Sequence, residues 1–444
     1  MLALAALLLS STDAHAWSQH YLLMDRALDH ASVDWADQTV LVEPLEDLLA
    51  DAPLAMATAV AQHQAWLQEE GSERFLPQEL PTPRPTRADF LAATRLNPGV
   101  HFPLVLRVPP GQSSAGFSAR PEVASSYLHA LPGQAADVRV VHAGQLVSAR
   151  EVLRTYVDEP DWGFDHELWG YEQYGYGTQP YGKAQGESSK APFHMQFDHE
   201  NFLTKAFTDL EEGMVPERID LFLRLSRAAF DSGHPYWGLR FAAWASHYAQ
   251  DLCQPYHAKA IPGVGFGWYL GYVLSPHKDQ ISTERTQLEA NRHFIYEDFV
   301  AVTLQRSYTE SNATSNATPN ATPNAAPDLT ATALAATLSQ GPATLPKVSG
   351  VDSLVATITK ESAHHGRKLE HTLVDAFPVR DMQDPGYDVE TAKDYDITAL
   401  IAGLTPTQAQ QVLQGTGVDF EETGEATRTV LAMAHVAAAL GGGE

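Results

Sequence analysis

Apolar residues recur at helical spacing along most of the chain, which predicts a mostly α-helical fold. The first amphipathic stretch runs from His20 to Leu28. Further helices are predicted at 43–70, 149–156, 192–210, 216–230, 235–252, 351–377 and 421–440. Pro192, Pro216 and Pro235 each suit the first turn of a helix, where no backbone N–H is needed. We expect the segment 17–440 to form one α-helical domain.

Two stretches interrupt the helical pattern. Residues 76–150 are rich in proline and glycine and contain short extended runs at 102–108 and 138–141, so we expect a large irregular insertion that is part β. A second, low-complexity insertion is expected at 308–345, because Asn-Ala-Thr repeats broken by proline fill residues 311–326. A segment of this composition cannot build a core and should be disordered or exposed.

The first sixteen residues have the pattern of a secretory signal peptide. An apolar run at 2–9 leads to Ala14-His15-Ala16, an A-x-A cleavage site. Cleavage there would make Trp17 the new N-terminus and predicts a secreted or periplasmic protein. No later stretch approaches the roughly 20 apolar residues that a membrane-spanning helix needs.

Charge and cysteine content limit the chemistry. The 29 basic residues stand against 55 acidic ones, a net charge of −26, which argues against a protein held on nucleic acid or anionic lipid by bulk positive charge. Phosphate substrates remain compatible, since bound divalent cations would reverse the field inside a site. Cys253 is the only cysteine, so a zinc site must be built from His, Asp and Glu.

Potential ligands concentrate around residues 245–257. His247 and Asp251 lie four residues apart and would share one face of a helix, while His257 follows the helix-ending Pro255. His293 and Glu297 repeat the four-residue spacing. Imidazole and carboxylate are ligands that zinc accepts. Taken singly, such residues are usually surface ion pairs or buried, hydrogen-bonded histidines.

This spacing, His247-x3-Asp251-x3-Pro255-x-His257 followed by His293-x3-Glu297, resembles the zinc-dependent phospholipase C and single-strand-specific zinc nuclease superfamily. The similarity extends upstream along residues 223–241. Members of that family begin their mature chain with Trp, place a His shortly after it and bind three zinc ions in an α-helical domain.

The resemblance implies three zinc sites in this chain. The ligands would be Asp161, His194, His247 and Asp251 for one ion, the Trp17 amine and carbonyl, His20 and Asp251 for the second, and His257, His293 and Glu297 for the third. His199 is an alternative to His194. Asp161 would also accept a proton from the attacking water.

The activity expected from this resemblance is hydrolysis of a phosphoester by a metal-activated water. A phospholipid head group is the favoured substrate, with transient contact to a membrane surface through aromatic residues at 162–181. A single-strand nuclease or nucleotidase is the alternative within this class, since the same rings could stack on a base. An alternative of another class is a zinc-binding interaction protein that has lost catalysis.

Overall fold

The computed structural model describes residues 19–69, 79–112, 138–165, 191–197, 213–259, 262–316 and 330–441. These residues are mostly helical, as predicted. Residues 1–16, Trp17, His199 and most of the aromatic stretch 162–181 lie outside this set. Within it, no helix is long and apolar enough to cross a membrane.

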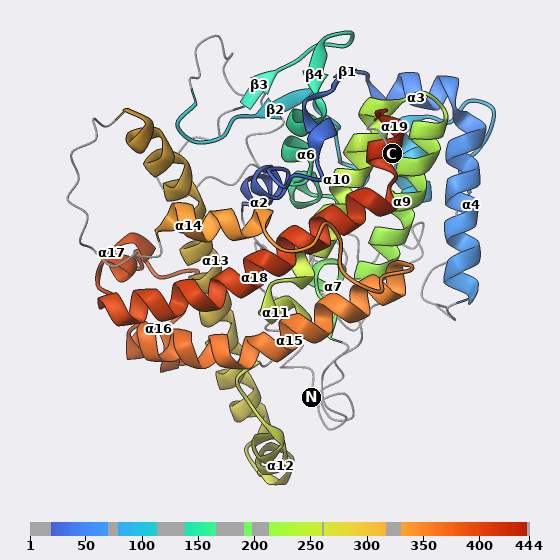
Figure 1. The fold of residues 1–444 in the computed structure, drawn as a ribbon. Coiled ribbons are helices and arrows are strands. Elements are labelled where there is room, and N and C mark those ends of the chain that lie inside the picture. The colour runs from blue at the N-terminus through green and yellow to red at the C-terminus, as the bar shows by residue number, and fades with distance from the viewer. Residues whose placement is uncertain are drawn as a thin grey trace.

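Helix α10 is the centre of the molecule (Figure 1). It runs from Pro235 to Leu252, and every residue from Tyr236 onward is buried. A helix that is buried all round must be covered on all sides, and α10 packs against α6, α9, α15 and α18. Its closest partner, α9, approaches at Gly238, where an added Cβ would lie 2.6 Å from the Phe230 ring.

The other helices surround this centre. Those before α10 are α2 (His20–Ala27), α3 (Leu45–Asp51), α4 (Pro53–Glu69), α5 (Arg87–Thr94), α6 (Ala149–Tyr156), α7 (Ala191–His194) and α9 (Val215–Asp231), with the 3-10 turns η1 (Asp34–Asp37) and η2 (Glu159–Trp162). Those after it are α11 (Pro255–Ala258), α12 (Phe266–Leu274), α13 (Lys278–Asn316), α14 (Ala331–Ala336), η4 (Thr337–Ser339), α15 (Val351–Ala376), α16 (Val379–Gln383), α17 (Ile397–Ala402), α18 (Pro406–Met433) and α19 (Val436–Ala439).

The expected insertion at 76–150 contains strand structure where it is described. Strands β2 (Val105–Arg107) and β3 (Val138–Val140) pair antiparallel, and β4 (Leu146–Ser148) pairs antiparallel with β1 (Thr39–Leu41). The segment also contributes to the main core, because Phe102 packs against the rings of Phe90, Phe164, Trp237 and Trp244. These contacts fasten this segment to the helices that carry the candidate site.

Several predicted helices have different bounds. The predicted helix 43–70 is two helices, α3 and α4, and the predicted helix 421–440 begins fifteen residues earlier, where Thr405 caps α18. Residues 198–210 of the predicted helix 192–210 lie outside the described set. Within that set, α7 ends at His194 and residues 195–197 are not helical. There the Gln196 N–H donates to the His257 carbonyl at 2.9 Å instead of continuing a helix. That bond draws the segment after His194 against α11.

The low-complexity insertion is narrower than the expected 308–345. Helix α13 continues to Asn316, and Tyr308 is buried, with its hydroxyl donating to Asp25 at 2.7 Å. At the other end, Leu334, Leu338 and Leu345 are buried in the core. The physical reason is that apolar residues return after the repeats and pack against α18.

Candidate metal centre

The C-terminal end of α10 presents two of the predicted ligands side by side. His247 and Asp251 lie one helical turn apart, as their spacing predicts, and His247 Nε2 lies 3.4 Å from Asp251 Oδ2. Both side chains are fully buried. Helix α10 ends at Leu252, and Pro255 then begins the four-residue helix α11 that carries His257.

A first group of ligand atoms forms around Asp161, His194 and His247. The His194 Nδ1 atom lies 3.1 Å from His247 Nε2 and 2.7 Å from Asp251 Oδ2. Asp161 Oδ1, from η2, lies 3.9 Å from His247 Nε2. The turn η2 is anchored by its first residue, Glu159, which pairs with the buried Arg240 of α10.

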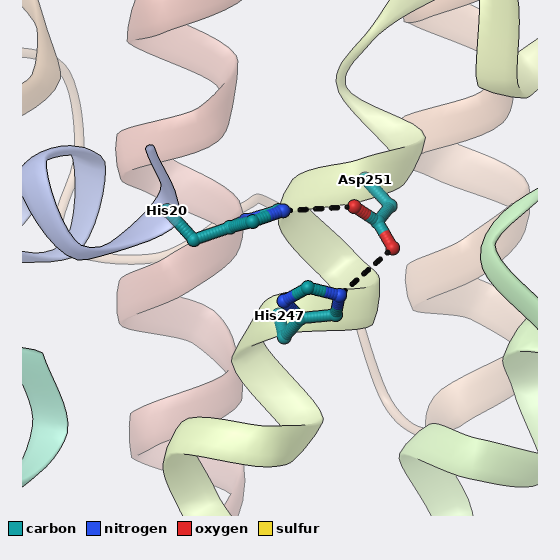
Figure 2. A group of neighbouring side chains, drawn as sticks. All are labelled: His20, His247 and Asp251. Carbon is teal, nitrogen blue, oxygen red and sulfur yellow. Dashed lines mark ion pairs between the residues drawn. The ribbon is translucent and has the colours of Figure 1, made fainter. Parts of the chain in front are cut away.

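A second group contains His20, His247 and Asp251. Helix α2 brings His20 to the other oxygen of Asp251, so His20 Nε2 lies 3.1 Å from Oδ1 while Oδ2 faces His247 (Figure 2). His20 Nε2 also lies 3.9 Å from Asp161 Oδ2. The two oxygens of Asp251 therefore face two different histidines, as a carboxylate shared by two ions would.

A third group is formed by His257, His293 and Glu297. His257 Nε2 lies 3.1 Å from His293 Nε2, and His293 Nε2 lies 2.8 Å from Glu297 Oε1. His257 also donates from Nδ1 to the His194 carbonyl at 2.7 Å, so this group adjoins the first. All the predicted ligands among the described residues thus fall into one of three neighbouring groups.

The spacing of these atoms fits a metal ion. Two ligands at 2.0–2.1 Å from one tetrahedral zinc are separated by roughly 3.3 Å, and the pairs named above lie between 2.7 and 3.9 Å apart. His20 Nε2 and Asp251 Oδ1 are buried and face each other, yet neither makes a hydrogen bond with a described residue. Buried polar atoms normally have partners, so these two atoms could hold an ion between them.

In His20 and His247 the second ring nitrogen is held by a hydrogen bond. The Nδ1 atom of His20 donates to the side-chain oxygen of Gln250 at 2.9 Å. The Nδ1 atom of His247 donates to the carbonyl oxygen of Val157 at 2.8 Å. Such bonds fix the ring and leave Nε2 as the ligating atom. His194 is turned the other way, because its Nε2 lies 3.2 Å from Asp165 Oδ2.

Burial sets the charge of the centre. It lowers the pKa of His247 to about 3 and that of His257 to about 4, so both rings are neutral at pH 7 and able to ligate a metal. Burial alone would raise the pKa of Asp251, but His247 and His194 lower it below its usual range. The centre therefore offers neutral imidazoles and an ionised carboxylate.

Two supporting residues were missed from the sequence. Asp165 contacts His194, accepts a hydrogen bond from the Tyr248 hydroxyl at 2.6 Å and pairs with Arg218. Burial would raise its pKa, yet Arg218 and His194 lower it to about 2. Gln250 orients His20 and donates to Thr427 at 3.0 Å. The four-residue spacing of Asp161 and Asp165 was a usable signal, whereas Gln250 gave none.

The chain was compared with protein-family models, with curated proteins and with solved structures, and none of the three comparisons found a match.

Proposed function

We propose that this chain is a zinc-dependent phosphoester hydrolase whose most favoured activity is phospholipase C-like cleavage of phospholipid head groups. The observation that carries the proposal is the arrangement of Asp251. Its two oxygens face His20 on one side and His194 and His247 on the other, with His257, His293 and Glu297 adjoining. This is the ligand arrangement expected for a bridged pair of ions and a third ion beside it.

Zinc suits this donor set better than other common cations. Groups of imidazole and carboxylate in a buried site favour zinc, whereas calcium and magnesium prefer all-oxygen sites. The only cysteine, Cys253, is buried, and burial raises the pKa of its thiol well above the usual value. We propose three zinc ions, with the Trp17 amine and carbonyl completing the second site after export and cleavage behind Ala16.

Bound zinc supplies a water of lowered pKa and stabilises charge that builds up on phosphate oxygens. The protein's own contribution centres on Asp161. Its side chain is 9% exposed, whereas those of His20, His247 and Asp251 are fully buried, so Asp161 is more open to a solvent-borne substrate than these three. Its oxygens lie 3.9 Å from His20 and His247. We assign it the proton-accepting role.

The decisive experiment compares substrates and metal states. The purified, metal-loaded chain should release phosphocholine from phosphatidylcholine vesicles and lose this activity when chelated, with recovery on adding zinc. Asp161→Asn should abolish hydrolysis while the protein stays folded, and Asp231→Asn on α9 is a matched control. Hydrolysis that survives in metal-free protein would overturn the proposal.

Two alternatives are outcomes of the same experiment. Cleavage of single-stranded DNA in place of phosphatidylcholine would identify a nuclease, although the net charge of −26 disfavours a long polyanion. Binding of three zinc ions without hydrolysis of any phosphoester would identify a zinc-binding interaction protein.

A further inference from the structure

Helix α12 presents an apolar face to solvent. Its nine residues, Phe266–Leu274, stand away from the body at one end of α13 (Figure 1). The exposed positions are Gly267, Leu270, Gly271 and Leu274, which follow the i, i+3, i+4, i+7 spacing of one helical face. Leu270 is 46% exposed and Leu274 is 74% exposed. An ordinary surface helix carries polar residues on such a face.

Among the described residues, none lies close to the two glycines of this face. An added Cβ at Gly267 or Gly271 would meet no atom within 4 Å. Behind the face, the ring of Trp268 stacks on that of Tyr272 with centroids 5.5 Å apart. Trp and Tyr are the side chains enriched where hydrocarbon meets lipid head groups.

Charge is excluded from the same segment. Between Lys259 and Lys278 the chain has no Asp, Glu, Lys or Arg, although 19% of the whole sequence is charged. Arg367 lies at the base of the helix, with Nη2 3.7 Å from where a Cβ of Gly265 would be. Cationic side chains flanking an apolar segment can extend to lipid phosphates while the segment is inserted.

We propose that α12 is a membrane-interface anchor that inserts its Leu270 and Leu274 face among the lipids of a phosphatidylcholine bilayer. Nine residues are too few to span a bilayer, which takes about 20, so the helix lies in the interface. A second copy of the chain fits less well. A helix of this length and about 10 Å width covers on the order of 150 Å², far below the roughly 800 Å² per partner of a stable dimer.

The anchor implies that the substrate is a lipid held in a bilayer, and this part of the inference rests on the proposed function. His257 and His293 of the third ligand group bracket α12 in the sequence. Fifteen residues of α13 separate Lys278 from His293, about 22 Å at 1.5 Å per residue. An inserted α12 would thus keep the candidate metal centre near the lipid surface, and the centre itself would stay outside the bilayer.

Vesicle binding tests the anchor without catalysis. The metal-loaded chain should sediment with phosphatidylcholine vesicles, and Leu270→Glu/Leu274→Glu should lower the partition coefficient by roughly tenfold or more, because two apolar contacts are replaced by charges. Leu54→Glu/Val379→Glu is the matched control, since these residues are 71% and 67% exposed on α4 and α16. The emission of a fluorophore attached at Leu274→Cys should shift to the blue when vesicles are added. Cys253 is buried and should not react with the label.

Equal binding by the wild type and Leu270→Glu/Leu274→Glu would overturn the anchor. The anchor would also be overturned if light scattering showed that the variant loses an oligomer formed by the wild type while vesicle binding is unchanged. The α12 face would then join two copies of the chain. Hydrolysis of a soluble short-chain phosphodiester should be the same in both proteins. If no phosphoester is hydrolysed, the proposed function fails, while reduced vesicle binding by the variant still supports the anchor.

Discussion

Nε2 of His257 and Nε2 of His293 face each other 3.1 Å apart in a buried site. His257 donates from its other nitrogen to the His194 carbonyl, so its Nε2 carries a lone pair that points at His293. With Glu297 beside them, the two rings form the third ligand group. Of the three groups, this one has all its predicted ligands among the described residues and shares none with another.

Replacing His257 with Ala should remove one metal ion and leave the others. A site that loses one of three ligands binds far more weakly, so the zinc content should fall from about three to about two ions per chain after dialysis. Mass spectrometry of the metal content checks this. His142→Ala, at an exposed histidine, should leave the content unchanged. If His257→Ala binds as many zinc ions per chain as the wild type, the assignment of the third site is wrong.

Replacing Asp165 with Asn should weaken zinc binding through His194. The carboxylate lies 3.2 Å from His194 Nε2, and loss of such a partner typically reduces metal affinity by about 10- to 100-fold. Competition with a chelator measures the affinity. The change also leaves Arg218 without its buried charge partner, so a stability control is needed.

Asp220→Asn supplies that control. Asp220 is buried, accepts from His63 Nδ1 at 2.8 Å and pairs with Arg224, but His63 belongs to none of the three groups. We expect this variant to lose stability while zinc affinity stays the same. Equal loss of affinity in both variants would mean that Asp165 acts through stability alone.

The helical spine could be predicted from the sequence because its rules are local. The apolar pattern and Pro235 predicted α10, and a four-residue spacing put His247 next to Asp251 without any knowledge of the rest of the fold. His20 and Asp161 reach the same place only through the packing of α2 and η2 around α10. Their assignment therefore depended on a family resemblance.

The features that the sequence did not predict depend on tertiary contacts. The end of α7 at His194 follows from a hydrogen bond between Gln196 and His257, residues far apart in the sequence. Gln250 looks like any polar residue of a helix until His20 is brought against it. Neither contact leaves a periodic pattern in the chain.

Replacing Arg240 with Met should destabilise the protein strongly. Arg240 and Glu159 are fully buried and pair, with the Trp244 indole N–H donating to Glu159 at 2.8 Å. Removing one partner leaves an uncompensated charge and typically costs about 3–5 kcal/mol. Urea unfolding measures the free energy.

The double variant Arg240→Met/Glu159→Gln isolates that charge. The amide keeps a hydrogen-bond acceptor for Trp244 and removes the buried charge, so the double variant should be more stable than Arg240→Met alone. If it is no more stable, the cost comes instead from lost packing of Arg240 on the Tyr156 ring.

The metal-free protein should lose stability between pH 6.5 and pH 4. The pKa of His257 is about 4 when folded and 6.5 when unfolded, so the unfolded chain binds more protons in this window and stability rises with pH across it. The contribution is complete above pH 6.5 and is on the order of 3 kcal/mol. Urea unfolding of chelated protein at several pH values checks this.

His257→Gln serves as the comparison for the pH dependence. The amide does not titrate, so the variant should show a shallower dependence over the same window, whereas His142→Gln should keep the wild-type slope. Parallel curves for the wild type and His257→Gln would contradict the assignment.

The meeting of His20 with Asp161 closes a loop of about 140 residues that contains all of β1 to β4. The entropy of loop closure grows only with the logarithm of length, and two doublings, from about 35 to about 140 residues, cost only about 1.2 kcal/mol. A metal ion bound by both ends would act as a removable cross-link on this loop. Long stretches can therefore be added between two candidate ligands at little thermodynamic cost, so the connection can diversify while the candidate metal centre stays the same.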